Sequence, residues 1–126
     1  VKRNLQSLVV AQAAVTALVS AFGDSTLSLR LRDLPTGYEA YLVTPLSNEE
    51  AKRETCRIED THPLGRLFDL DVIDADGVPV SRELIGKAPR KCLVCDSDAR
   101  YCMRNRTHSL DELSARIDEM IESYVR

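Results

Sequence analysis

The sequence predicts an α+β fold in which a small, mostly antiparallel sheet is covered by an N-terminal and a C-terminal helix. Three observations support this prediction. Apolar residues recur at helical spacing over residues 4–22, two segments of alternating polarity flank a turn-rich stretch, and a second helical stripe follows Ser109. The chain has 126 residues, 44% of them hydrophobic, which is enough for one domain with its own core. We therefore expect residues 1–126 to form a single domain.

The first half of the chain carries a helix and then a hairpin. The helix is expected over residues 4–22 and ends at Gly23, because glycine favours the position after a helix. Residues 26–31 and 39–43 alternate apolar with polar side chains, and the turn formers of residues 33–37 separate them. This order predicts two antiparallel strands joined by a tight turn.

Two capping boxes mark the starts of two further helices. Ser47 and Glu50 stand three residues apart before a mostly polar stretch that reaches residue 60, where we expect a surface helix. Ser109 and Glu112 have the same spacing ahead of an apolar stripe, which predicts a terminal helix of about four turns.

Composition excludes several kinds of partner. The 17 basic and 20 acidic residues give a net charge of -3, which disfavours nucleic acid as a partner. The longest apolar run, residues 8–19, is shorter than the roughly 20 residues that span a bilayer, so no membrane partner is expected. Three of the four cysteines crowd together, a pattern more typical of metal ligation than of secreted disulfides. We therefore expect a cytoplasmic protein.

An acidic pair stands in a segment predicted to be a short strand, residues 66–73, which is followed by a predicted turn at residues 74–77. Asp69 and Asp71 would share one face of that strand, with α-carbons roughly 6.6 Å apart at a rise of about 3.3 Å per residue. Two such carboxylates can hold Mg²⁺ against a triphosphate, because metal ions neutralise the charge that builds up during displacement at phosphorus. The alternative is that both are ordinary solvated residues on the wet face of a sheet.

A cysteine-rich stretch has the spacing of a metal-binding knuckle. Cys92 and Cys95 form a C-x2-C pair, and Cys102 and His108 could complete a tetrahedral Cys3His site for structural Zn²⁺. The alternatives are reduced thiols packed as small hydrophobic groups, or a disulfide between the first two cysteines. Cys56 has no second ligand near it in the sequence and is not expected to take part.

A longer sequence pattern includes both the acidic pair and the cysteine-rich stretch. The segments HPLGRLFDLDV (residues 62–72), SR (81–82), PRKCLVC (89–95) and CMR (102–104), followed by His108, resemble the holo-citrate lyase acyl-carrier-protein synthases. The resemblance implies a nucleotidyltransferase-type enzyme. Such an enzyme joins 2'-(5''-triphosphoribosyl)-3'-dephospho-CoA to a serine of the apo acyl carrier protein (gamma) subunit of citrate lyase and releases pyrophosphate. These two molecules are the expected partners.

The resemblance also implies roles for single residues. Asp69 and Asp71 become the carboxylates that hold the catalytic Mg²⁺. His62 becomes a candidate to assist deprotonation of the carrier serine, although a histidine before proline can equally serve a loop through a structural hydrogen bond. The candidates for contact with the substrate and its phosphates are Gly65, Arg66, Arg82, Arg90 and Arg104.

The chain differs from the family pattern in one segment, and a rival function also fits the sequence. Family members normally begin with a further arginine-containing segment to which nothing in residues 1–126 corresponds, so we expect a transferase domain without that segment. The rival is a non-catalytic, zinc-stabilised module that docks on another protein through its terminal helices. Such a module would bind zinc but would have no affinity for the triphosphate.

Overall fold

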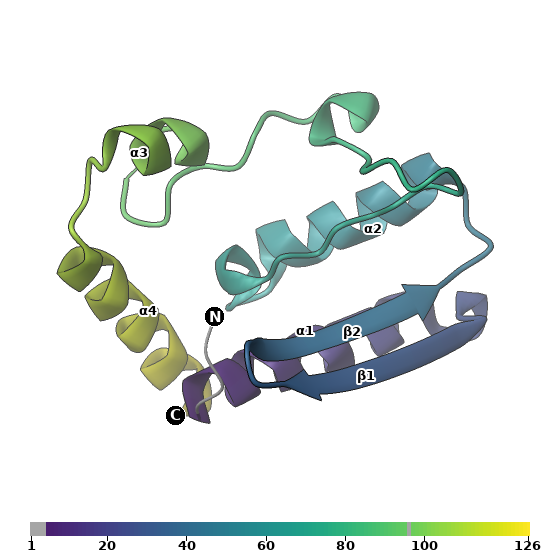
Figure 1. Ribbon diagram of the computed structural model, residues 1–126, viewed down its shortest axis with the longest axis horizontal. Helices are drawn as coiled ribbons and strands as arrows, with labels where there is room; N and C mark the ends of the chain where they lie inside the picture. Colours follow the sequence, from purple (N-terminus) through teal and green to yellow (C-terminus); the bar gives the residue numbers. More distant parts are fainter. Residues whose placement is uncertain (1–4, 96) are drawn as a thin grey trace.

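The computed structural model describes residues 5–95 and 97–126. Within these residues the regular structure consists of four α-helices and one two-stranded antiparallel sheet, which confirms the predicted α+β class. In chain order the elements are α1 (Leu5–Phe22), β1 (Ser28–Leu34), β2 (Gly37–Val43), α2 (Asn48–Thr61), α3 (Ala99–Asn105) and α4 (Leu110–Val125) (Figure 1). Short 3-10 turns at Gly23–Ser25, Gly65–Leu67 and Arg82–Ile85 lie between them.

The hairpin lies against α1, which runs behind both strands in Figure 1. Its register pairs Ser28 with Val43 at the open end and Leu34 with Gly37 beside the two-residue loop. Both strands therefore extend closer to the turn than the alternating pattern predicted. The C-terminal helix α4 packs mainly on α1, so of the two terminal helices it is α1 that covers the sheet.

The N-terminal helix is the most apolar element of the chain. By length and composition alone, Leu5–Ser25 could cross a membrane, and this stretch is longer than the run of residues 8–19 that the sequence suggested. One such helix near an N-terminus is weak evidence for a span, because core helices of soluble proteins pass the same test. In the structure Ala13 is buried in the core, and Val9 and Leu18 pack against it.

Helix α2 corrects the expectation of a surface helix. Six of its residues are buried: Ala51, Lys52, Thr55, Cys56, Ile58 and Glu59. The polar groups among them have partners, for example Thr55, whose hydroxyl donates to the Lys52 carbonyl at 3.1 Å. A polar helix can be buried when its polar atoms are hydrogen-bonded, so its composition did not reveal its place at the centre of the fold.

The core joins the two ends of the chain to the segment after α2. It consists of Ala13 from α1, Ile58 from α2, Ile121 from α4, and Leu64, Phe68 and Leu70 from the following segment. Leu64 is fully buried and Phe68 is 2% exposed. The segment that carries the acidic pair is thus fixed by its apolar residues on one side.

The strand predicted over residues 66–73 is not present as such. The chain instead makes the 3-10 turn Gly65–Leu67 and continues without a strand partner until an isolated bridge pairs Ile73 with Pro79. The turn predicted after it is confirmed: the Asp74 carboxylate accepts hydrogen bonds from the backbone N–H groups of Asp76 and Val78, both at 2.9 Å.

Both predicted helix starts are confirmed. The Ser47 side chain accepts a hydrogen bond from the Glu50 backbone N–H, and Ser109 with Glu112 forms a complete capping box. The short helix α3 was not predicted from the sequence. It begins at Asp98, whose carboxylate accepts from the Arg100 backbone N–H at 2.8 Å.

Candidate functional site

The acidic pair lies on one exposed side of its segment. Phe68 and Leu70 are buried while Asp69 and Asp71 are exposed, so the period-two alternation holds although no strand forms. Burial raises the pKa of the Asp71 carboxyl, and the charge of Asp69 raises it further, while the ammonium of Lys52 partly opposes the rise. The structure therefore brings the two carboxylates together beside a basic group of α2.

Asp69 also lies on the wall of a groove of about 1050 Å³. The groove runs between α1 and the hairpin, and the segment 67–70 lines one part of it. Its volume is at the upper end of the range of ligand sites in proteins, about 300–1,000 Å³. A ligand held by the acidic pair would thus have a large apolar surface next to it.

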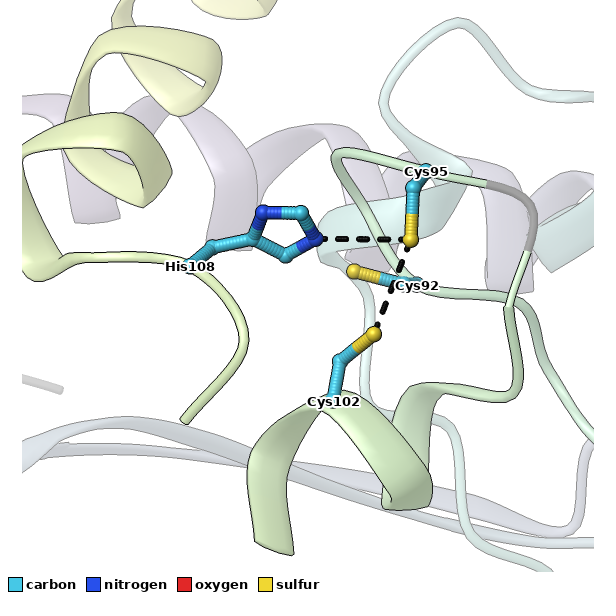
Figure 2. A group of neighbouring side chains, drawn as sticks. All are labelled: Cys92, Cys95, Cys102 and His108. Atoms are coloured by element: carbon cyan, nitrogen blue, oxygen red, sulfur yellow. Dashed lines mark hydrogen bonds between the residues drawn. The ribbon is translucent and has the colours of Figure 1, made fainter. Parts of the chain in front are cut away.

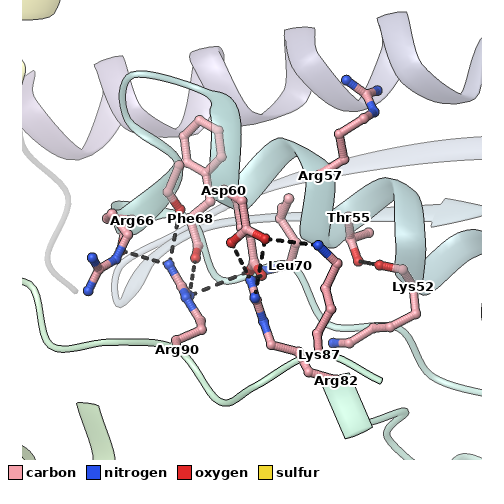
Figure 3. A network of polar contacts seen from close by, with 12 residues as sticks. Lys52, Thr55, Arg57, Asp60, Arg66, Phe68, Leu70, Arg82, Lys87 and Arg90 are labelled. Atoms are coloured by element: carbon pink, nitrogen blue, oxygen red, sulfur yellow. Dashed lines mark hydrogen bonds and ion pairs between the residues drawn. The ribbon is translucent and has the colours of Figure 1, made fainter. Parts of the chain in front are cut away.

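Arg90 points into the protein (Figure 3). Its guanidinium donates hydrogen bonds to three backbone carbonyls, those of Gly65 at 3.0 Å, Arg66 at 2.9 Å and Phe68 at 2.8 Å. The same group approaches the Glu59 carboxylate at 3.5 Å. The side chain thus joins the loop before the cysteines to the turn before the acidic pair.

Arg82 is also engaged with groups of the chain itself. Its guanidinium contacts the Glu59 carboxylate at 2.8 Å and the Asp60 carboxylate at 3.1 Å. The Lys87 ammonium contacts the other oxygen of Asp60 at 3.3 Å. With 13% of the Arg82 side chain exposed, the pair with Glu59 is largely shielded from water.

Sequence reasoning missed Glu59, which lies at the centre of these contacts. Its side chain is 5% exposed, and one carboxylate oxygen accepts a hydrogen bond from the backbone N–H of Leu70 at 3.2 Å. Leu70 is the residue between the two aspartates. Nothing in the sequence marked Glu59, because its partners lie 11 to 31 residues away along the chain.

The remaining predicted residues lie around the turn Gly65–Leu67 or farther away. The His62 ring accepts a hydrogen bond at Nδ1 from the Leu64 backbone N–H at 2.9 Å and packs against Phe68, and burial lowers its pKa. Arg66 donates to the Lys91 carbonyl, beside the first cysteine of the knuckle. Arg104 is exposed near the end of α3.

The four predicted ligands of the knuckle meet in space (Figure 2). Their ligand atoms all lie within 4.8 Å of one another, although they come from the loop before α3, from α3 itself and from the loop between α3 and α4. The Cys95 sulfur lies 3.6 Å from that of Cys102 and 3.3 Å from Nε2 of His108. Three sulfurs and one imidazole nitrogen at this separation could hold a metal ion.

His108 and burial shift the pKa values of two thiols of the cluster in opposite directions. A hydrogen bond from His108 lowers the pKa of the Cys95 thiol to about 6, whereas burial raises the pKa of Cys102 to about 11. The other ring nitrogen of His108, Nδ1, lies 3.5 Å from the Glu112 carboxylate. A carboxylate behind a histidine is the usual outer partner of a metal ligand, because it fixes the ring's tautomer and orientation.

The site has two features. The first is an exposed pair of carboxylates on a segment that has no strand partner and is held by hydrogen bonds. The second is a Cys3His cluster, whose loop is joined to that segment through Arg66 and Arg90. A family model described as "Apo-citrate lyase phosphoribosyl-dephospho-CoA transferase" matches residues 1–124. The chain belongs to this family.

Curated relatives give the same result. A probable apo-citrate lyase phosphoribosyl-dephospho-CoA transferase from Vibrio cholerae serotype O1 (strain M66-2) is 41% identical over 98% of this chain and 72% of its own length. Proteins with the same name from Streptococcus pyogenes are 37% identical over 87% of the chain (serotype M18, strain MGAS8232) and 35% identical over 98% (serotype M3, strain ATCC BAA-595 / MGAS315). The chain spans 59% of the length of the former and 67% of the latter.

Proposed function

We propose that this chain transfers the prosthetic group of 2'-(5''-triphosphoribosyl)-3'-dephospho-CoA to a serine of the apo acyl carrier protein subunit of citrate lyase. The serine oxygen forms a bond to the first phosphorus of the triphosphate, the bond from that phosphorus to the bridging oxygen breaks, and pyrophosphate leaves. The serine proton passes to a base or to solvent. Family membership supports this proposal, and the observation that carries it is the exposed carboxylate pair Asp69 and Asp71.

In this proposal the reaction is a nucleotidyl transfer carried out by residues 1–126 as one domain in the cytoplasm. Asp69 and Asp71 would hold Mg²⁺, which neutralises the charge that develops on the phosphate oxygens. Burial first, and the neighbouring charge of Asp69 second, raise the pKa of Asp71, and a bound cation would oppose both effects. The groove beside Asp69 would take the rest of the substrate.

The basic groups proposed for the phosphates are one exposed arginine and one largely buried lysine. Arg104 is exposed, and the Lys52 charge acts on Asp71 from α2.

For His62 the structure favours the structural alternative. Because Nδ1 accepts the Leu64 N–H, the neutral ring carries its proton on Nε2 and has no free lone pair to act as a base.

We further propose that the knuckle binds Zn²⁺ in a closed, structural site. Three cysteine sulfurs and one histidine nitrogen form a ligand set that zinc prefers, and a four-ligand site leaves no open position for substrate. Its contribution would be to fix the loop before α3 and the start of α4. The rival hypothesis of a non-catalytic zinc module shares this site, so zinc binding alone does not separate the two.

The transferase proposal is tested by the mass of the apo acyl carrier subunit after incubation with this chain, the triphosphate substrate and Mg²⁺. The subunit should gain the mass of the prosthetic group, and both Asp69→Asn and Asp71→Asn should slow the gain by at least about 100-fold, since each removes a metal carboxylate. Asp76→Asn, in the exposed turn of the same segment, is the matched control and should keep the rate. Wild-type rates in both Asp69→Asn and Asp71→Asn would disprove the assignment.

A further inference from the structure

Arg82 and Arg90, two arginines of the family-like pattern, do not have the placement expected of arginines that bind a phosphate. Arg82 and Arg90 are 13% and 28% exposed, and their donors are directed to acceptors of the chain itself. An arginine that binds phosphate presents its planar group of N–H donors to the ligand. Here the two terminal nitrogens of each guanidinium already donate to internal acceptors, so a phosphate could take these donors only by displacing internal partners.

The internal partners form one connected network, which we name the clamp: Glu59, Arg82 and Arg90. Arg90 donates to three carbonyl oxygens of the Gly65–Phe68 stretch (Figure 3). The Glu59 carboxylate accepts the Leu70 backbone N–H. Arg82 contacts Glu59 at 2.8 Å and fixes the carboxylate from the other side. The clamp thus bonds backbone groups on both sides of Asp69.

These hydrogen bonds replace the ones that a neighbouring strand would form in a sheet. From Gly65 to Asp71 the segment has no strand partner, so its buried carbonyl and N–H groups need other hydrogen-bond partners. The clamp supplies them from α2 and from the loop before the knuckle. Because side chains alternate along extended backbone, fixing the carbonyl of Phe68 and the N–H of Leu70 fixes the direction of Asp69 between them.

We infer that Glu59, Arg82 and Arg90 are positioning residues that hold Asp69 and Asp71 in place to bind Mg²⁺, and that the two arginines are not phosphate ligands. This inference rests on the proposed function for its catalytic consequence. Its structural part stands by itself, because the hydrogen bonds to the 65–70 backbone are made entirely by groups of the chain.

The test is Arg90→Lys in the full chain. Lysine keeps the positive charge but cannot reach three carbonyls and a carboxylate with one planar group. The matched control is Arg57→Lys on the exposed side of α2, where the guanidinium forms an ion pair with Glu54. Amide hydrogen exchange at residues 66–72 should become at least about 10-fold faster in Arg90→Lys and stay unchanged in Arg57→Lys, with α1 and α4 unaffected in both.

The second readout is the Mg²⁺ dependence of transfer. Arg90→Lys should need several-fold more Mg²⁺ for half-maximal rate, with KM for the triphosphate within about 2-fold of wild type, since a positioning residue acts through the metal carboxylates. A large rise in KM at saturating Mg²⁺ would show that Arg90 binds phosphate and would overturn the inference. Unchanged exchange at 66–72 would overturn it as well. If the wild-type chain shows no transfer, the proposed function fails, and the exchange result alone still decides whether the clamp holds this segment.

Discussion

At the scale of single residues, Gly65 shows why a motif position need not be a contact to substrate. A Cβ atom built there would lie 2.2 Å from the Glu59 carbonyl oxygen and 2.7 Å from that of Ile58. Both atoms belong to the backbone of α2, which cannot rotate away as a side chain could. Only glycine lets the turn pack so closely against the last turns of α2. No local sequence pattern indicates this, because the contact depends on the packing of α2.

This packing predicts the effect of Gly65→Ala. The added methyl group must push the turn away from α2, which should lower the free energy of unfolding by about 3 kcal/mol, the upper end of overpacking costs. Gly86→Ala is the control, because its Cβ meets open space and only the left-handed backbone, with φ +72°, opposes it at about 1 kcal/mol. Urea denaturation measures both. A Gly65→Ala protein as stable as Gly86→Ala would contradict the close approach.

Sequence reasoning at this scale found residues but not their partners. Arg82 and Arg90 were expected to meet substrate because arginines in such motifs often bind phosphate, yet they meet Glu59, 23 and 31 residues away. Short-range spacing could predict Asp69 beside Asp71, since that depends only on the local backbone. It could not predict the clamp, which depends on how α2 packs against a distant loop.

At the scale of elements, local signals predicted starts and turns well. The caps at Ser47 and Ser109 and the Asp74 turn all form as expected, because each is decided by neighbours within four residues. Alternating polarity at residues 66–73 was mistaken for a strand, since extended backbone gives the same pattern whether or not another strand is beside it.

The knuckle is an element whose stability should depend on its metal. Purified under reducing conditions, the chain should contain about one zinc ion, and Cys92→Ser or Cys102→Ser should lose it, because a three-ligand site binds far more weakly. Cys56→Ala is the matched control: it removes the buried cysteine that lies outside the cluster and should keep the zinc. Elemental analysis measures the content. Metal-free wild-type protein, or equal zinc in the cluster variants, would rule out the site.

At the scale of the whole molecule, hydrogen bonds of two arginines join the segments that carry the two candidate sites. Arg66 and Arg90 both bond across the gap between the acidic segment and the knuckle loop, to the Lys91 carbonyl in one case and to the Gly65–Phe68 turn in the other. The metal site would therefore hold the loop that carries Arg90 of the clamp. The clamp would in turn hold the segment that carries the two carboxylates. Composition and periodicity predicted the class of fold, whereas this long-range arrangement became visible only in three dimensions.

The central claim is that Asp69 and Asp71 together bind a cation-bound polyphosphate. Isothermal titration calorimetry of the triphosphoribosyl-dephospho-CoA substrate, with and without Mg²⁺, tests it most directly because it requires neither the carrier protein nor turnover. We expect binding that depends on Mg²⁺ and weakens by at least about 10-fold in Asp71→Asn, with wild-type affinity in Asp76→Asn. Equal affinity with and without Mg²⁺, or in wild type and Asp71→Asn, would contradict the claim.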